Sequence, residues 1–240
     1  MNIFQKGFNY SQDGPGNRLV YHLKGCNMHC PWCSNPEGMS VSGGAYTVMT
    51  PSELVAEAVS SKPMFFDGGG VTFTGGEATL QTSELTQVLE GLKEHGIHTA
   101  IETNGTHRQL SDLFRLLDYL IIDLKHPCGA KHQRVTGVDN TVIKENIRLA
   151  SQSGKDLLIR IPLIGGFNND EESRQGFLDF LGSLDSGRVT VEILKYHEYG
   201  KDKWAKCGME YQMTDAFVSE EDHRRFENEL QTVGISTIRT

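Results

Sequence analysis

Residues 119–125, YLIIDLK, form a nearly continuous apolar run that ends in charged side chains. A second run of this kind, DLLIRIP, spans residues 156–162. Strands that are apolar on both faces are typical of parallel sheets, in which helices cover one face and a packed interior covers the other. The two segments therefore indicate an α/β fold built on a parallel sheet.

On both sides of these runs, short apolar segments alternate with longer segments of helical period. Six strands are predicted, at residues 19–23, 71–74, 99–103, 119–124, 157–161 and 189–194. Three stripes with helical spacing predict core-facing helices: Leu85, Val88, Leu89 and Leu92; Leu110, Leu113, Phe114 and Leu117; and Phe177, Phe180, Leu181 and Leu184. Further helices are predicted at 51–60, 141–153 and 219–232. Six strand-helix units predict a partial (β/α)6 barrel of the TIM type with parallel strands.

The composition is that of an ordinary globular protein, with 38% hydrophobic and 22% charged residues among 240. No linker or repeat divides the chain, so we expect one domain, 1–240. A net charge of −8 argues against binding to nucleic acid or to an anionic membrane surface, which needs clustered Lys and Arg. No stretch approaches the ~18 apolar residues of a membrane span, and the N-terminus lacks the apolar core of a signal peptide. We therefore expect a cytoplasmic protein.

Polar clusters follow the predicted strands. They are KGCNMHCPWC at 24–33, GGE at 75–77, ETNG at 102–105, DLK at 123–125, Arg160 within the fifth strand, and YHEYG at 196–200. The carboxyl ends of parallel strands meet at one rim, where the chemistry of such folds collects. The clusters are therefore expected to converge on one site.

Three of the five cysteines, Cys26, Cys30 and Cys33, lie within eight residues in a C-x3-C-x2-C spacing. Three thiolates can hold three corners of an iron-sulfur cube and leave the fourth iron open. A zinc site would need a fourth ligand, for which His29 is the nearest candidate, and a thioredoxin-like role would leave Cys26 unexplained. Cys128 and Cys207 are predicted to be passive thiols, buried or half-buried.

This spacing, with Trp32 directly before the last cysteine, resembles the signature of the radical S-adenosylmethionine superfamily. The segment YSQDGPGNR, residues 10–18, resembles the DGPG-x-R segment of glycyl-radical-enzyme activating enzymes. GGGVTFTGGE, ETNG, DLK and YHEYGKDKW resemble further blocks of that family in the same order, so the resemblance covers nearly the whole chain.

No cysteine lies between Cys33 and Cys128, so the chain resembles the compact form of pyruvate formate-lyase activase type, without a ferredoxin-like insert. One departure is CSNPEG at 33–38, which resembles insert-bearing relatives and leaves the choice of partner open.

The resemblance implies a [4Fe-4S] cluster on Cys26, Cys30 and Cys33, with S-adenosylmethionine bound to the open iron. Reductive cleavage of S-adenosylmethionine would give a 5′-deoxyadenosyl radical, which would abstract a Cα hydrogen from a glycine of a partner glycyl radical enzyme. The implied electron donor is a flavodoxin or a ferredoxin. We further expect a monomer whose barrel is open on one side, so that a large substrate loop can enter.

The roles of single residues also follow from the resemblance. Cofactor binding falls to Trp32, Asn35, Gly75, Gly76, Glu77, Thr103, Asp123, Arg160 and His197. A monovalent cation, Na⁺ or K⁺, would be held by Glu102, Thr103, Asp123 and the carbonyl of Ile121. The family commonly has Asp at position 102, so Glu102 puts this cation site in question. The loop of Asp13, Gly14, Pro15, Gly16 and Arg18 would help to hold the substrate loop.

Other interpretations stay open for several of these residues. Arg160 could form a structural salt bridge, Lys125 could be a surface lysine, and the Asp13 loop could be a simple turn. At the level of function, the alternatives are a radical S-adenosylmethionine enzyme acting on a small molecule or peptide, and a non-catalytic metal-binding scaffold.

Overall fold

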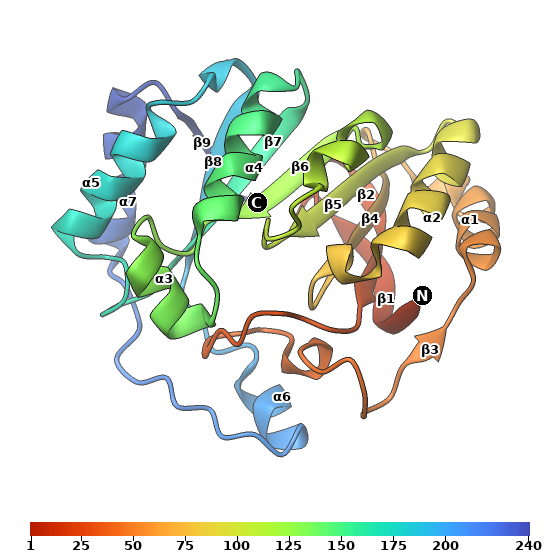
Figure 1. Cartoon of the computed structure of the whole chain (residues 1–240), viewed down its shortest axis with the longest axis horizontal. Helices are drawn as coiled ribbons and strands as arrows, with labels where there is room; N and C mark the ends of the chain where they lie inside the picture. Colours follow the sequence, from red (N-terminus) through yellow and green to blue (C-terminus); the bar gives the residue numbers. More distant parts are fainter.

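The computed structural model describes residues 1–240 and contains one nine-stranded sheet with helices on its outer side (Figure 1). The strands are β1 Asn2–Tyr10, β2 Asn17–Leu23, β3 Thr47–Val48, β4 Gly70–Gly75, β5 His98–Thr103, β6 Tyr119–Asp123, β7 Asp156–Leu163, β8 Val189–Lys195 and β9 Ser236–Ile238. Their order in the sheet is β3-β1-β2-β4-β5-β6-β7-β8-β9. Because β3 and β9 do not pair with each other, the barrel is open.

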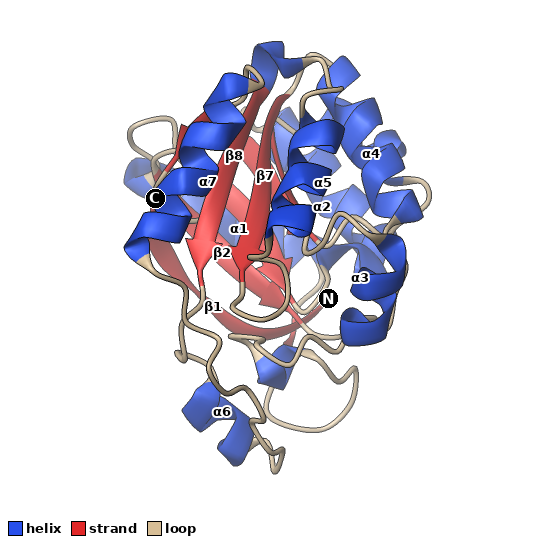
Figure 2. Ribbon diagram, turned by 90° about the vertical axis from the view of Figure 1, so that its left-hand side faces the viewer, coloured by secondary structure: helices blue, strands red, loops and turns tan.

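From β2 to β9, every pair of neighbouring strands is parallel, whereas β1 runs antiparallel to both β2 and β3. Parallel neighbours need a crossover connection between them, and the helices supply it on the outer face. The arrowheads of β7 and β8 in Figure 2 therefore point toward the same end of the molecule. The carboxyl ends of the parallel strands share this rim.

The helices are α1 Pro51–Ser60, α2 Thr82–Glu94, α3 Gly129–Thr136, α4 Thr141–Gln152, α5 Glu171–Leu181, α6 Lys201–Lys206 and α7 Glu220–Thr232. Helix α1 begins where a local signal predicts it. Thr50 is its N-cap, Pro51 occupies the first turn, and Glu53 closes a capping box with Thr50. Such a box satisfies backbone donors that the first turn would otherwise leave unpaired.

One contiguous hydrophobic core fills the space between the strands and the outer helices. Leu120, Ile121 and Ile122 of β6 are all buried, as the apolar run in the sequence predicts. No helix in the structure is both long enough and apolar enough to span a bilayer.

The six predicted strands are confirmed as β2 and β4–β8. The sequence did not reveal β1, β3, β9, α3 or α6. Strand β1 is mostly exposed or half-buried, so it has no apolar run, and β3 has only two residues. These strands are fixed by pairing along an existing sheet edge rather than by their own composition.

Two expectations were wrong. The stripe from Leu110 to Leu117 does not form an α-helix, because Leu110–Leu116 is a 3-10 helix. Its apolar residues are buried all the same, so the spacing predicted the core-facing residues correctly but not the type of helix. Cys128 and Cys207 are exposed, not buried or half-buried.

Candidate active site

The three clustered cysteines follow directly after β2, at the rim formed by the carboxyl ends of the strands. None of them is in a disulfide; Cys30 is buried, and Cys26 and Cys33 are half-buried. All three line one cavity of about 210 Å³. The loop thus presents three thiols to one cavity.

Burial makes these thiols hard to ionise without a nearby cation. Burial raises the pKa of Cys30 to about 12 and that of Cys33 to about 11, and it also raises the pKa of Cys26. Two backbone amides donate to the sulfurs, Met28 N to Cys26 Sγ and Asn35 N to Cys33 Sγ, each at 3.4 Å. Such N–H···S contacts stabilise thiolate ligands of iron-sulfur clusters.

The expected convergence of strand ends on this cavity is present. Beyond the cysteines, the lining comes from the carboxyl ends of the strands and the loops that follow them, and it includes Trp32, Asn35, Gly75, Gly76, Glu102, Thr103, Asn104, Asp123, Lys125, Tyr196 and His197. Glu77, Ile121, Arg160 and the loop 11–16 do not line it. The roles assigned to all these residues stay predictions.

The GGE segment packs the end of β4 against the start of the cysteine loop. The Gly76 amide donates to the Leu23 carbonyl at 2.8 Å, and the Glu77 amide donates to the Gly25 carbonyl at 2.6 Å. A Cβ at Gly76 would lie 2.2 Å from the Gly25 oxygen, and Gly75 has a φ of +123°. Only glycine permits this approach and this backbone conformation.

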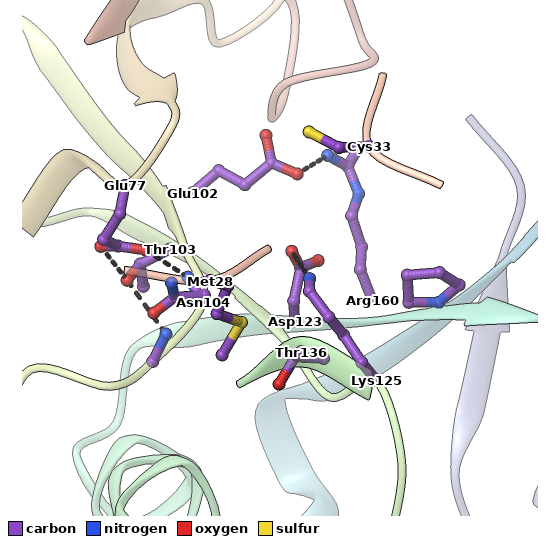
Figure 3. Close-up of polar contacts among 12 residues, drawn as sticks. Met28, Cys33, Glu77, Glu102, Thr103, Asn104, Asp123, Lys125, Thr136 and Arg160 are labelled. Carbon is purple, nitrogen blue, oxygen red and sulfur yellow. Dashed lines mark hydrogen bonds and ion pairs between the residues drawn. The ribbon is translucent and has the colours of Figure 1, made fainter. Parts of the chain in front are cut away.

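The Glu77 side chain is buried, and its carboxylate accepts hydrogen bonds only from its own chain (Figure 3). The hydroxyl of Thr103 donates to it at 2.6 Å, as does the Asn104 amide, also at 2.6 Å. The Thr79 amide and hydroxyl donate to it as well, at 2.9 and 2.5 Å. The carboxylate therefore ties the end of β4 to the end of β5, next to the cavity wall.

Arg160 lies at the centre of a buried ionic network in the barrel interior. Its Nη1 donates to Glu102 at 2.6 Å and its Nε to Glu192 at 2.9 Å, while Nη2 donates to the Gln12 carbonyl. Burial, the largest single influence, would raise the pKa of Glu102, but the charge and hydrogen bond of Arg160 together with the hydrogen bond of Thr74 lower that pKa overall. The arginine therefore holds the Glu102 carboxylate ionised beside the cavity.

Lys125 is buried rather than at the surface, and its ammonium contacts the Asp123 carboxylate at 2.6 Å (Figure 3). Burial alone would lower the pKa of Lys125, but Asp123, together with Cys30 and Cys26, raises it above its usual value. The site therefore carries a fixed cation close to the cysteines, and the ammonium opposes the rise in their pKa values.

The oxygens expected to hold a monovalent cation are largely engaged in other contacts. Both oxygens of Glu102 have donors, from Arg160 at 2.6 Å and from Thr74 at 2.8 Å. The Thr103 hydroxyl donates to Glu77 and accepts from the Gly105 amide at 3.0 Å. These residues do not fit an open cation cage in this structure, because the carboxylates of Glu102 and Asp123 already contact Arg160 and Lys125.

The loop with Asp13, Gly14, Pro15 and Gly16 joins the end of β1 to the start of β2. It therefore reaches the barrel interior from the amino ends of the parallel strands, opposite the cysteine loop. The Asp13 carbonyl accepts from Thr72 at 2.7 Å. Burial, followed by the charge of Glu102, raises the pKa of Asp13 to about 6.

Arg18 is fully buried beneath this loop. It donates to the Pro15 carbonyl at 3.0 Å, to Thr72 at 2.6 Å and to the Val71 carbonyl at 2.7 Å. These bonds fasten the loop to β4, so Arg18 holds the turn in place.

Residues after β8 complete the cavity wall. Tyr196 and His197 line it, and burial lowers the pKa of His197 so that the neutral imidazole is favoured. Trp32 packs against Phe167, with ring centroids 4.9 Å apart, and forms part of the apolar lining. Asn35 lies on the cavity wall two residues after Cys33.

Sequence reasoning missed two contributors to the site. Asn104 contacts both Cys26 Sγ, at 3.9 Å, and Asn27, at 2.8 Å, and its place within the quoted ETNG block was the available signal. Trp204 donates its indole N–H to the Cys33 carbonyl at 2.9 Å. Its place at the end of the quoted YHEYGKDKW block was the available signal, although nothing local shows that it contacts a residue 171 positions away.

The donor set fits an iron-sulfur cluster with one open iron. Three thiols without disulfide partners face one cavity, and backbone N–H groups are aimed at two of the sulfurs. Thiolate is the usual protein ligand of such clusters, and the adjoining cavity leaves room for a ligand on the remaining iron.

Comparisons with known proteins agree with this chemistry. Residues 20–178 match the radical SAM superfamily. A pyruvate formate-lyase-activating enzyme from Staphylococcus aureus is 35% identical over 219 residues, which cover 88% of this chain and 86% of that protein.

Two solved structures illustrate the likeness of the fold. A domain of a pyruvate-formate lyase-activating enzyme from Bacteroides vulgatus is 32% identical with a TM-score of 0.59, covering 71% of this chain and 98% of that one. A radical SAM methyltransferase from Sphaerobacter thermophilus has a TM-score of 0.65 at 15% identity, covering 99% of this chain and 75% of that one, and it shows the fold alone. The chain therefore belongs to the radical S-adenosylmethionine superfamily, which implies a [4Fe-4S] cluster and S-adenosylmethionine as cofactors, and within it to the glycyl-radical-enzyme activating enzymes that the pyruvate formate-lyase-activating enzymes represent.

Proposed function

We propose that this chain activates a glycyl radical enzyme by removing one Cα hydrogen from a glycine of that partner. The observation that carries the proposal is the 35% identity to a pyruvate formate-lyase-activating enzyme along 88% of the chain. The site supports it, because three thiols and the ends of the parallel strands surround one cavity.

In this proposal Cys26, Cys30 and Cys33 hold the cluster. The cluster and S-adenosylmethionine, when bound, supply the one-electron cleavage of a carbon-sulfur bond and the hydrogen-abstracting radical that results. The chain's own residues bind S-adenosylmethionine, orient it and exclude water from the cavity. Met28 and Trp32 give the cavity apolar walls that limit side reactions with solvent.

Polar groups at the strand ends would orient S-adenosylmethionine. We assign this role to the backbone at Gly75 and Gly76, to Asn35 and His197, and to the ion pair of Asp123 and Lys125, all of which line the cavity. Thr103 lines it too, although its hydroxyl is bonded to Glu77.

Three further predicted groups would act from behind the cavity wall. Glu77 and Arg160 would position the wall, since their polar atoms are bonded within the chain. The loop 11–16 is assigned to the substrate loop by the family resemblance alone, since it lies at the amino ends of the parallel strands, opposite the cysteine loop. No step is assigned to a monovalent cation.

The proposal extends to context. We expect a single domain acting as a monomer in the cytoplasm, where a flavodoxin or a ferredoxin delivers the electron. A reducing compartment fits three closely spaced cysteines without disulfides.

The test is electron paramagnetic resonance of candidate partner enzymes after anaerobic mixing with this protein, S-adenosylmethionine and a reductant. We expect a glycyl doublet on one partner and none with Cys30→Ala protein. Cleavage of S-adenosylmethionine without a doublet on any glycyl radical enzyme would indicate a small-molecule or peptide substrate. Protein that binds no cluster, or holds only zinc, would indicate a metal-binding scaffold.

A further inference from the structure

We infer that helix α6 is a positioning element of the cysteine loop. Trp204 of this helix holds the backbone at Cys33, and Lys203 orients the Asn35 amide toward the cavity. The inference rests on the proposed cluster and S-adenosylmethionine site, but not on the identity of the partner enzyme. Neither residue lines the cavity, so both act through residues that do.

The first contact holds the backbone of a cluster ligand. Trp204 is mostly buried, and its indole Nε1 donates to the Cys33 carbonyl at 2.9 Å. Gly200, just before α6, lies so close that a Cβ there would be 2.4 Å from the same oxygen. The Cys33 carbonyl is thus clamped between the indole and the start of the helix.

The second contact decides which way an amide faces. The Lys203 ammonium donates to Asn35 Oδ1 at 2.9 Å and pairs with Glu37 at 3.2 Å. An ammonium has only donors, so the oxygen of the amide must face it. The Asn35 NH₂ group, which has no hydrogen bond to the chain, is then the group left for the cavity that Asn35 lines. It is suited to an acceptor atom of the bound ligand.

The position of α6 in the fold gives these contacts their importance. The sheet is open between its first and last strands, and α6 lies beyond the carboxyl ends of β7 and β8 (Figure 2). It packs on the 3-10 helix Pro36–Gly38 that follows the cysteines. The helix therefore connects the end of β8 with the cysteine loop where no strand pairing does so.

An aromatic chain anchors α6 on the β8 side. The Trp204 ring contacts Tyr211 edge-on, with centroids 5.7 Å apart, and the Tyr211 hydroxyl bonds the Tyr196 hydroxyl at 2.9 Å. Tyr196 lines the cavity. A displacement of α6 would therefore move two parts of the cavity wall, the cysteine loop and Tyr196.

The first experiment tests Trp204 on reconstituted protein without any partner enzyme. Trp204→Phe keeps an aromatic ring and removes the N–H donor. We expect release of cluster iron to a chelator to accelerate about tenfold, the lower end of the loss usual for groups that support metal ligands. The electron paramagnetic resonance signal of the reduced cluster should change as well. Iron release and a signal identical to wild type would overturn the role of Trp204.

The second experiment tests Lys203 through affinity for S-adenosylmethionine. Lys203→Met keeps the aliphatic stem and should weaken binding about tenfold at unchanged iron content, while Lys203→Arg should restore most of it. The matched control is Lys206→Met, in the same helix and without a polar contact, which should bind like wild type.

A double-mutant cycle separates orientation from general disturbance. If Lys203 acts through the amide, Asn35→Ala and Lys203→Met together should weaken binding no more than either alone. Fully additive losses, or equal affinities of Lys203→Met and wild type, would refute the orientation of Asn35. These readouts need no partner, so they distinguish a failure here from a failure to form a glycyl radical.

Discussion

The cysteine loop and the charged interior of the barrel differ in how their polar side chains are satisfied. Cys26 and Cys33 receive only long N–H···S contacts, and burial raises the pKa of all three thiols. In the interior, Arg160 bonds Glu102, Glu192 and a backbone carbonyl at once. The loop therefore offers three thiols for ligation of a group from outside the chain, whereas the carboxylates of the interior already have donors within the chain.

The largest effect should come from breaking the cysteine loop. Replacing Cys30 with alanine removes one of three thiolates, so the cluster should not assemble and formation of 5′-deoxyadenosine should fall about a thousandfold or more, equivalent to ~4 kcal/mol. The measurement is nucleoside yield with excess reductant. Cys128→Ala and Cys207→Ala, at exposed thiols, are the controls and should keep wild-type yield.

The second-largest effect should come from removing the central cation of the charged interior. Arg160→Met leaves Glu102 and Glu192 buried without their cation, so the cluster-free protein should lose about 3–5 kcal/mol of unfolding free energy. Urea unfolding followed by circular dichroism measures it. Arg188→Met breaks an exposed ion pair with Asp156, 2.9 Å long, and should cost less than about 1 kcal/mol. Equal losses in both variants would contradict the central place of Arg160.

The third effect is a change of stability with pH, and it concerns Asp13 at the edge of the charged interior. Burial first, and Glu102 second, raise the pKa of Asp13 to about 6, so the folded state holds a proton that the unfolded chain releases near pH 4. The stability from protonated Asp13 is present below about pH 4 and is lost as the pH rises through about 6.

Asp13→Asn should remove that loss and be more stable than wild type at pH 7 by roughly 1–3 kcal/mol. Unfolding curves of cluster-free protein from pH 4 to 8 measure it. Asp112→Asn, at an exposed position, should follow the wild-type profile, and an Asp13→Asn profile parallel to wild type would count against the raised pKa.

The smallest effect should be the dependence of the reaction on a monovalent cation, which would bind between the cysteine loop and the charged interior. Because Arg160 and Lys125 already pair with Glu102 and Asp123, exchanging Na⁺ or K⁺ for choline should change S-adenosylmethionine cleavage by less than about twofold, or ~0.4 kcal/mol. A tenfold stimulation by one of the ions would show that the cation expected from family resemblance binds after all.

Local signals in the sequence were enough for the parallel part of the fold. Buried strands such as β6 carry uninterrupted apolar runs, and α1 begins at Pro51, the predicted start of a helix. The same signals wrongly predicted an α-helix at Leu110–Leu116, which is a 3-10 helix. Its apolar residues have a spacing that would also place them on the buried face of an α-helix.

The six parallel strands and the three closely spaced thiols can be predicted from local sequence, since apolar runs and short spacings are properties of neighbouring residues. The distant partners of Glu77, Arg160 and Trp204 follow from the tertiary structure, because those contacts span 26 to 171 positions in the chain. A hydrogen bond depends on where two distant backbones come together, and this follows from the packing of the whole sheet rather than from any local pattern.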